Sequence, residues 1–267
     1  MTDLELLHQP PAGAQARPAP LLFIHGAWHG AWCWQETFLP HFAAHGYDCY
    51  ALSLRGHGGS PGRERLRWTG IRQHKRDVAA IMAELPAAPI LIAHSMGGFV
   101  AQKVLETHAL PGVVLLAPIP HTGSLRFALR LLRKDPKSFF SALLTLRLYP
   151  IVGTIDRVSY WFLHDSLPET QRAALHARLQ DEAFQIFLDT LLLELPRPSR
   201  VRAGKTPILV IAGGDDRIFS VAELAATARV YGADFTLLPN AAHNLMIEPD
   251  WPRAAELILD WLRCREL

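Results

Sequence analysis

The stretch Ile-Leu-Ile-Ala-His-Ser-Met-Gly-Gly-Phe, residues 90–99, decides how this chain folds. Its first half is an aliphatic run that predicts a buried strand, and residues 99–108 predict a helix. Between them, Ala93 lies two positions before Ser95 and Gly97 lies two positions after it. This small-x-Ser-x-Gly spacing is typical of a nucleophile elbow, because a serine on so tight a turn has a strained backbone that leaves no room for bulky flanking side chains.

Strands and helices alternate along most of the remaining chain. Short apolar runs predict strands at residues 4–8, 21–24, 48–54, 89–93, 112–117, 207–211 and 234–238. Helical spacing of apolar residues predicts helices at residues 31–45, 71–85, 221–231 and 251–263. This alternation is typical of an α/β fold with a mostly parallel sheet that helices cover on both faces. In such a sheet, sites lie at the carboxyl ends of the strands.

The rhythm changes after Pro118 and Pro120. Residues 121–202 show helical patches and no strand-like run, which predicts a helical cap between the two parts of a core domain, residues 1–120 and 203–267. The cap is rich in apolar and aromatic residues. We expect most of them to form its own core and the rest to line a pocket for an apolar acyl or aryl group; the aromatic ones are Phe127, Phe139, Phe140, Tyr160, Trp161 and Phe162.

Composition excludes several classes of protein. Apolar residues make up 49% of the 267 residues, enough for a large core, and a net charge of +2 gives no reason to expect a nucleic-acid partner. The three cysteines have no metal-ligand spacing, and their odd number argues against a disulfide framework, so a reducing, cytoplasmic location is expected. Residues 1–5 lack the features of a signal peptide, and no apolar run is long enough for an integral membrane segment.

A serine nucleophile needs a base and a carboxylate that orients the base. His243 follows the last strand in a turn-prone loop, which lies at the same sheet edge as the elbow. Asp215 and Asp216 follow the strand at residues 207–211, and we expect Asp216 to be the catalytic carboxylate, with Asp215 as the alternative. The predicted catalytic residues are therefore Ser95, His243 and Asp216.

Acyl transfer also needs backbone N–H donors for the oxyanion that forms in the transition state. One donor is expected from Met96, the residue after the nucleophile. The other is expected from the loop after the strand at residues 21–24, from either Ala27 or Trp28. Gly26 lets this loop approach the elbow closely.

Three further histidines lie near the predicted site in the sequence. His25 ends a strand beside the oxyanion loop, and His57 lies in a glycine-rich loop, so structural roles are expected for both. His94 adjoins Ser95, but the turn directs it elsewhere.

Together these residues resemble the α/β-hydrolase superfamily. The resemblance covers nearly the whole chain and rests on His25-Gly26-Ala27-Trp28, Arg55-Gly56-His57-Gly58, Ala93-His94-Ser95-Met96-Gly97, Gly213-x-x-Asp216 and His243, in the order Ser, Asp, His. It implies an α/β-hydrolase fold with the cap inserted after the strand that follows the nucleophile helix, and serine hydrolase chemistry without a cofactor or a metal. Residues 25–34 also resemble the plant methylesterase and hydroxynitrile-lyase branch.

The chain departs from the family pattern in a few places. Ala93 replaces the first glycine of the elbow, and the N-terminal strands are short, so fewer strands are expected than in the full superfamily. The cyanogenic lyases carry a lysine after the catalytic histidine, where this chain has Asn244, which argues against lyase activity. A serine nucleophile also argues against dehalogenase and epoxide hydrolase chemistry, which uses an aspartate.

The resulting expectation is a carboxylesterase that acts on a small to medium apolar ester through an acyl-enzyme. The same three residues also serve carbon–carbon bond hydrolases, perhydrolases, thioesterases and lactonases. Some members of the superfamily keep the three residues and act as small-molecule receptors. The motifs alone do not separate these alternatives.

Overall fold

The computed structural model describes residues 2–13 and 16–267 and contains a seven-stranded sheet in the order β1-β3-β2-β4-β5-β6-β7. The strands are β1 (Leu6–Gln9), β2 (Leu21–Ile24), β3 (Cys49–Leu52), β4 (Ile90–His94), β5 (Val113–Leu116), β6 (Ile208–Gly213) and β7 (Asp234–Leu238). All pairs are parallel except β1 with β3, which is antiparallel. The sheet confirms the predicted α/β class, and each of the seven predicted strands is present.

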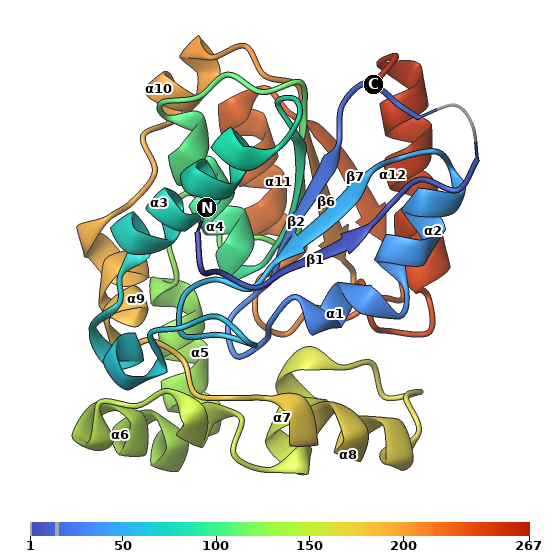
Figure 1. The fold of residues 1–267 in the computed structure, drawn as a ribbon. Coiled ribbons are helices and arrows are strands. Elements are labelled where there is room, and N and C mark those ends of the chain that lie inside the picture. Colours follow the sequence, from blue (N-terminus) through green and yellow to red (C-terminus); the bar gives the residue numbers. More distant parts are fainter. Residues whose placement is uncertain (1, 14–15) are drawn as a thin grey trace.

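Helices cover both faces of this sheet (Figure 1). Strand β2 shows why, because Leu22 and Ile24 join one apolar core while Leu21 and Phe23 join the other. The first core also contains residues of α3 (Ile71–Glu84), α4 (Met96–Leu105) and α11 (Val221–Tyr231). The second contains residues of α2 (Phe38–Ala44) and α12 (Trp251–Cys264). A strand that is buried on both faces needs apolar side chains at every position, which explains the unbroken apolar runs.

The single helix predicted at residues 31–45 is wrong. The chain forms two short helices there, α1 (Trp32–Gln35) and α2. Pro40 explains the break, because in a continuous helix its ring would collide with the carbonyl of Glu36. In the structure, Pro40 lies in the first turn of α2, where a proline is tolerated. Thr37 lies just before α2, and its hydroxyl donates to the carbonyl of Met246 at 2.8 Å.

The segment between β5 and β6 is helical, as predicted; its first helices form the lower part of Figure 1, and its last helix lies at the top left. Its regular elements are α5 (Leu125–Lys134), α6 (Pro136–Thr145), α7 (Ile155–Phe162), α8 (Glu169–Arg178), α9 (Phe184–Leu188) and α10 (Pro198–Ala203), with short turns of 3₁₀-helix at Tyr149–Ile151 and of π-helix at Asp189–Leu193. The division of the chain into a core and a cap at residues 121 and 202 stays a prediction.

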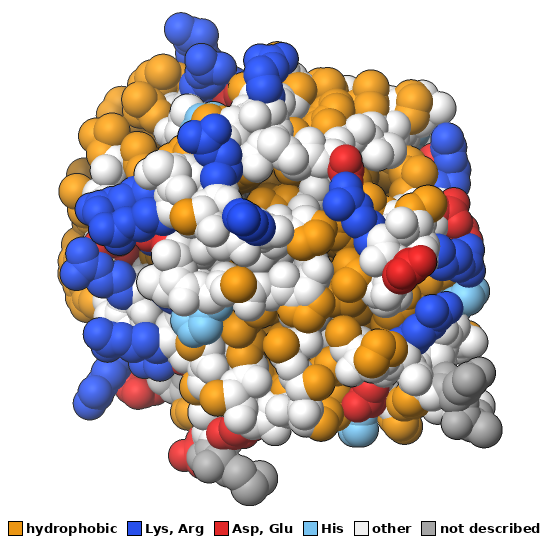
Figure 2. Space-filling model, turned by 90° about the horizontal axis from the view of Figure 1, so that it is seen from above, with side chains coloured by type: hydrophobic (Ala, Val, Ile, Leu, Met, Phe, Trp, Pro, Cys, Tyr) orange, Lys and Arg blue, Asp and Glu red, His pale blue; other side chains and the backbone are white. Residues whose placement is uncertain are grey.

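Figure 2 shows the end of the molecule opposite α6, α7 and α8. Lys and Arg side chains lie at separate places around this face, with apolar and neutral side chains between them. In the described part of the chain, no helix combines the length and the apolar character needed to cross a membrane.

Candidate active site

Ser95 lies at the sharp turn between β4 and α4. Its backbone has φ 51° and ψ −114°, a conformation that is rare for a residue with a side chain. The turn also brings Gly97 so close to the end of β2 that a Cβ atom there would lie 2.5 Å from the carbonyl oxygen of His25. Helix α4 begins directly after the serine, and the amino-terminal end of a helix favours negative charge nearby. This is the geometry that the elbow spacing predicts.

The structure brings Ser95, His243 and Asp216 together from three different loops. The Ser95 hydroxyl lies 2.9 Å from Nε2 of His243, and Nδ1 of His243 lies 2.8 Å from Oδ2 of Asp216. The other carboxylate oxygen of Asp216 accepts hydrogen bonds from the amides of Ile218 and Phe219, at 2.7 and 3.1 Å. Both side chains of the His243–Asp216 pair are buried, so the carboxylate has a fixed orientation toward the imidazole.

Asp215, the alternative carboxylate, lies elsewhere. Its side chain is about half exposed, and its Oδ2 lies 3.6 Å from Nε2 of His164. Its backbone N–H donates to the carbonyl of Ala241 at 3.0 Å. Of the two adjacent aspartates, only Asp216 contacts His243 in the described part of the chain.

The other histidines near the elbow make contacts with the surrounding loops. His25 donates through Nδ1 to the carbonyl of Gly26 and accepts from the amide of Leu54 through Nε2, at 2.8 and 3.1 Å. His94 donates through Nε2 to the carbonyl of His243 at 3.0 Å. Neither ring contacts the Ser95 hydroxyl, and both are buried, so their interactions are those of loop supports, as expected from the sequence.

The loop after β2 passes close to the elbow. A Cβ atom at Gly26 would lie 2.6 Å from the ring of His94 and 3.1 Å from Cβ of Ser95, so only glycine fits there. The next residues differ in their backbone contacts. The amide of Trp28 donates to Oε2 of Glu182 at 3.1 Å, whereas the amide of Ala27 has no acceptor among the described residues. Ala27 is therefore the residue of the pair whose N–H remains available to an oxyanion.

A narrow cavity of about 60 Å³ lies above Ser95. Its walls are mostly apolar. The sheet edge contributes Ala27, Trp28, Ser95, Met96, Ile119, Ile218 and Phe219, and the segment between β5 and β6 contributes Ser124, Phe127, Leu148, Phe162, Glu182, Ile186, Phe187 and Thr190. Two of the cap aromatics singled out from the sequence, Phe127 and Phe162, thus line the cavity, and the others do not.

Glu182 is the one acidic side chain in this wall, and sequence reasoning missed it. It is only 2% exposed and approaches His57 of the glycine-rich loop, with 3.0 Å between Oε2 and Nε2. His74 lies near the same pair, and these three could in principle hold a metal ion. However, the Glu182 oxygens already accept hydrogen bonds from Trp28, His57 and Ala183, so the carboxylate is well satisfied by the protein itself.

The residue after His243 is also buried. Asn244 is fully buried, and its side-chain amide lies 3.5 Å from Nε2 of His29. Its backbone N–H donates to the carbonyl of Phe162 at 3.2 Å, which ties the histidine loop to α7. Asn244 therefore has a structural explanation at the position where the cyanogenic lyases carry lysine.

Two curated plant proteins are similar to part of this chain. The chain is 29% identical over 113 residues to Methylesterase 3 of Arabidopsis thaliana, covering 40% of this chain and 43% of that protein. It is 32% identical over 96 residues to Methyl jasmonate esterase 1 of Vitis vinifera, covering 34% of this chain and 35% of that protein. The chain thus spans less than half the length of these curated relatives.

Solved structures share the fold at low sequence identity. The monoacylglycerol lipase of Paleococcus ferrophilus superimposes with a TM-score of 0.72 at 18% identity, covering 99% of this chain and 100% of that chain. The sequence profile described as "Alpha/beta hydrolase family" matches residues 21–255, which include the elbow, Asp216 and His243. These matches confirm the resemblance noted in the sequence. The chain belongs to the alpha/beta hydrolase family.

Proposed function

We propose that this protein is a serine hydrolase that cleaves carboxylic esters with a small apolar acyl group. The observation that carries the proposal is the continuous contact from Asp216 to His243 to Ser95, at 2.8 and 2.9 Å, below a narrow apolar cavity. Sites for drug-sized ligands have volumes of about 300–1,000 Å³. The much smaller cavity favours a short acyl chain.

In the first half of the reaction, Oγ of Ser95 attacks the carbonyl carbon while Nε2 of His243 takes the hydroxyl proton. Asp216 keeps the proton of His243 on Nδ1 and stabilises the imidazolium that forms. The amides of Met96 and Ala27 donate to the oxyanion. The carbon–oxygen bond of the ester then breaks, and His243 gives its proton to the leaving alcohol.

The second half returns the enzyme to its starting state. Water attacks the acyl-enzyme while His243 takes one of its protons, and the bond between Oγ and the acyl carbon breaks. Oγ recovers the proton from His243, and the carboxylic acid leaves. Each step uses only groups of this chain and one water molecule, so the proposed reaction has no cofactor.

The test is hydrolysis of a p-nitrophenyl ester series, from acetate to laurate, by the wild-type protein and by Ser95→Ala in parallel. We expect turnover that is fastest for the short acyl chains and that disappears in the variant. Turnover that persists in folded Ser95→Ala contradicts the assignment of the nucleophile. A folded wild-type protein that hydrolyses none of these esters contradicts the esterase proposal and favours a carbon–carbon hydrolase or a receptor.

A further inference from the structure

The cap segment at residues 180–182 holds Trp28 of the oxyanion loop from both sides. Oε2 of Glu182 accepts from the Trp28 amide, and the backbone N–H of Gln180 donates to the Trp28 carbonyl, both at 3.1 Å. Trp28 has φ 64°, in the left-handed region that residues with a side chain rarely adopt. Such a conformation persists only where the surroundings hold it. Here, both backbone polar groups of the strained residue are held by the cap.

The same segment also holds the glycine-rich loop after β3. The side-chain amide of Gln180 donates to the carbonyl of Gly56 at 2.8 Å and accepts from the amide of Gly58 at 3.0 Å. His57 lies between these glycines and places Nε2 toward Glu182. Residues 180–182 of the cap therefore contact two loops of the core that lie more than 100 residues away in the sequence.

Glu182 and His57 form a buried ion pair. Burial by itself lowers the pKa of His57, but the Glu182 carboxylate outweighs it, so the pKa is raised overall. Burial by itself raises the pKa of Glu182, but His57 and the amide of Ala183 lower it overall. The hydrogen bonds of His57 also fit a protonated ring. Its Nδ1 lies 3.1 Å from the carbonyl of Arg55 and its Nε2 lies 3.0 Å from Glu182, so both ring nitrogens face oxygen acceptors.

We propose that Glu182 is a positioning residue for catalysis, which holds the oxyanion loop through Trp28 and so keeps the Ala27 amide directed at the reacting carbonyl. The inference rests on the proposed function. His57 keeps Glu182 in place from the opposite side. The cap then takes part in the chemistry of the site as well as in its shape, although it supplies none of the three catalytic residues.

The experiment compares Glu182→Ala and Glu182→Gln with Asp181→Ala. Asp181 is the control for loss of an acidic side chain in this segment, because it is the adjacent residue and pairs with Arg147 and the backbone amides of Tyr149 and Glu182 without contacting Trp28. We expect Glu182→Ala to lower kcat for p-nitrophenyl acetate by about 10²-fold, the effect of losing one oxyanion donor, with little change in KM. Glu182→Gln keeps an oxygen that accepts from Trp28 and should retain most of the kcat, and Asp181→Ala should retain nearly all of it.

Circular dichroism and the melting temperature identify variants that fail to fold. Should Glu182→Ala unfold because it leaves the buried His57 without its partner, the double variant His57→Asn/Glu182→Ala takes its place. It removes both members of the pair and still lacks an acceptor for the Trp28 amide, so kcat is expected to remain low while the fold is intact. A folded Glu182→Ala with wild-type kcat overturns the proposal, as does an equal loss of kcat in Asp181→Ala.

A second readout separates this proposal from the proposed function. The rate at which a fluorophosphonate labels Ser95, followed by mass spectrometry, depends on the same oxyanion donors and on no particular ester. Wild-type protein that is neither labelled nor hydrolyses esters contradicts the proposed function. Wild-type protein that is labelled, with an equal labelling rate in Glu182→Ala, contradicts only the role of Glu182.

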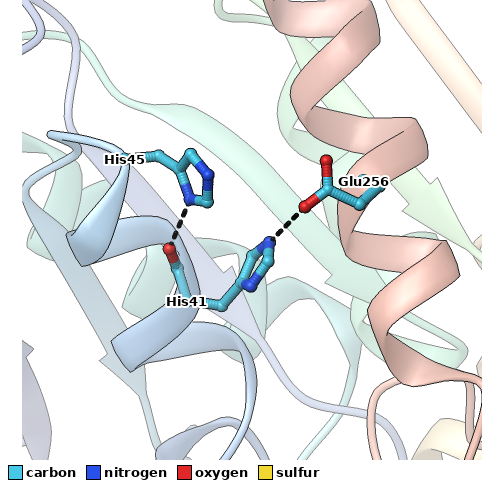
Figure 3. Close-up of side chains that lie close together, drawn as sticks. All are labelled: His41, His45 and Glu256. Atoms are coloured by element: carbon cyan, nitrogen blue, oxygen red, sulfur yellow. Dashed lines mark hydrogen bonds and ion pairs between the residues drawn. The ribbon is translucent and has the colours of Figure 1, made fainter.

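An independent cluster lies between α2 and α12, where His41, His45 and Glu256 approach one another (Figure 3). Nε2 of His41 lies 3.2 Å from Oε1 of Glu256, and the two imidazole rings are 4.8 Å apart. Nδ1 of His45 donates to the carbonyl of His41 at 2.8 Å, which leaves the lone pair of the neutral ring on Nε2. One potential ligand atom of each residue lies within 4.8 Å of the other two.

We infer that these three side chains form a Zn²⁺ site. Two imidazole nitrogens and a carboxylate oxygen are ligands that zinc prefers, and three protein ligands leave a fourth position for water. The Glu256 side chain is 50% exposed and that of His41 is 18% exposed, so an ion from solution reaches the site.

Isothermal titration of EDTA-treated protein with ZnCl₂ at pH 7.5 tests the site. We expect one Zn²⁺ per chain, binding at least tenfold weaker in His45→Ala and in Glu256→Gln, and a melting temperature that rises with Zn²⁺ but not with Mg²⁺. His8→Ala is the control, because His8 pairs with a single carboxylate, that of Asp48. No binding, equal binding in all variants, or binding lost only in a His57 variant overturns the inference.

Discussion

The loops at the sheet edge and the helices of the cap line the same cavity, but they constrain their residues in different ways. At the sheet edge, Ser95 has a strained backbone and Gly26 has no space for a side chain. One carboxylate oxygen of Asp216 accepts hydrogen bonds from two backbone amides, and the other faces His243. Five of the eight cap residues in the wall are apolar, and of the three polar ones, Ser124, Thr190 and Glu182, only Glu182 is acidic. We therefore expect the sheet edge to carry the reaction and the cap, apart from Glu182, to select the substrates that fit.

The strongest test of this contrast is a comparison of the two adjacent aspartates. Asp216→Asn should lower kcat by about 10³–10⁴-fold, because an amide favours the wrong tautomer of His243. Asp215→Asn should leave kcat within a few fold of wild type, since that side chain is half exposed and lies beside His164. Steady-state hydrolysis of p-nitrophenyl acetate measures both. A larger loss in Asp215→Asn would show that the other carboxylate serves the histidine.

A change in the cap should alter selectivity more than the reaction itself. Phe127 lines the cavity and packs against Trp161 and Phe219, so Phe127→Ala should enlarge the space above Ser95. We expect the rate ratio of p-nitrophenyl octanoate to acetate to rise by about tenfold, in keeping with the selectivity of apolar pockets for chain length. The control is Phe139→Ala, because Phe139 lies in the cap outside the cavity wall. An unchanged ratio in Phe127→Ala, or the same rise in both variants, would contradict this division of roles.

The smallest expected effect concerns the loop that carries His243. Glu248 accepts from the Ala242 amide at 2.8 Å, and burial raises the pKa of its carboxyl to about 7. Because an unfolded glutamate has a pKa of about 4.3, the folded state binds the proton more tightly, and stability falls as the pH rises from about 4.3 to about 7. The full stabilising contribution is thus present only below this range.

Glu248→Gln removes this titration and keeps an oxygen for the Ala242 amide. The melting temperature of the variant minus that of wild type should be higher at pH 8 than at pH 5. Each kcal/mol of stability corresponds to about 2–4 °C in this difference. Differential scanning calorimetry at both pH values measures the difference. The same offset from wild type at pH 5 and pH 8 would contradict a raised pKa at this position.

Much of the sheet edge could be predicted, because local patterns specify it. Short, mostly apolar runs predicted all seven strands, and the spacing around Ser95 predicted a tight, strained turn, which agrees with the observed φ of 51°. His243 and Asp216 could be selected because loops that follow parallel strands meet at one edge of the sheet. The alternatives that remained open, Asp215 or Asp216 and Ala27 or Trp28, differ by a single position, which chain order does not resolve.

The sequence by itself determined the fold class, the positions of the strands along the chain and the residue types that lie beside Ser95, because strand burial and tight turns are local properties of the chain. Only the tertiary structure decided that Trp28 donates to Glu182, that Asp216 contacts His243, and that Phe127 and Phe162 line the cavity. Helical periodicity identifies an apolar face but not its partner, and a buried carboxylate such as Glu182 has no local pattern. Its role depends on groups more than 100 residues away in the chain, which only folding brings together.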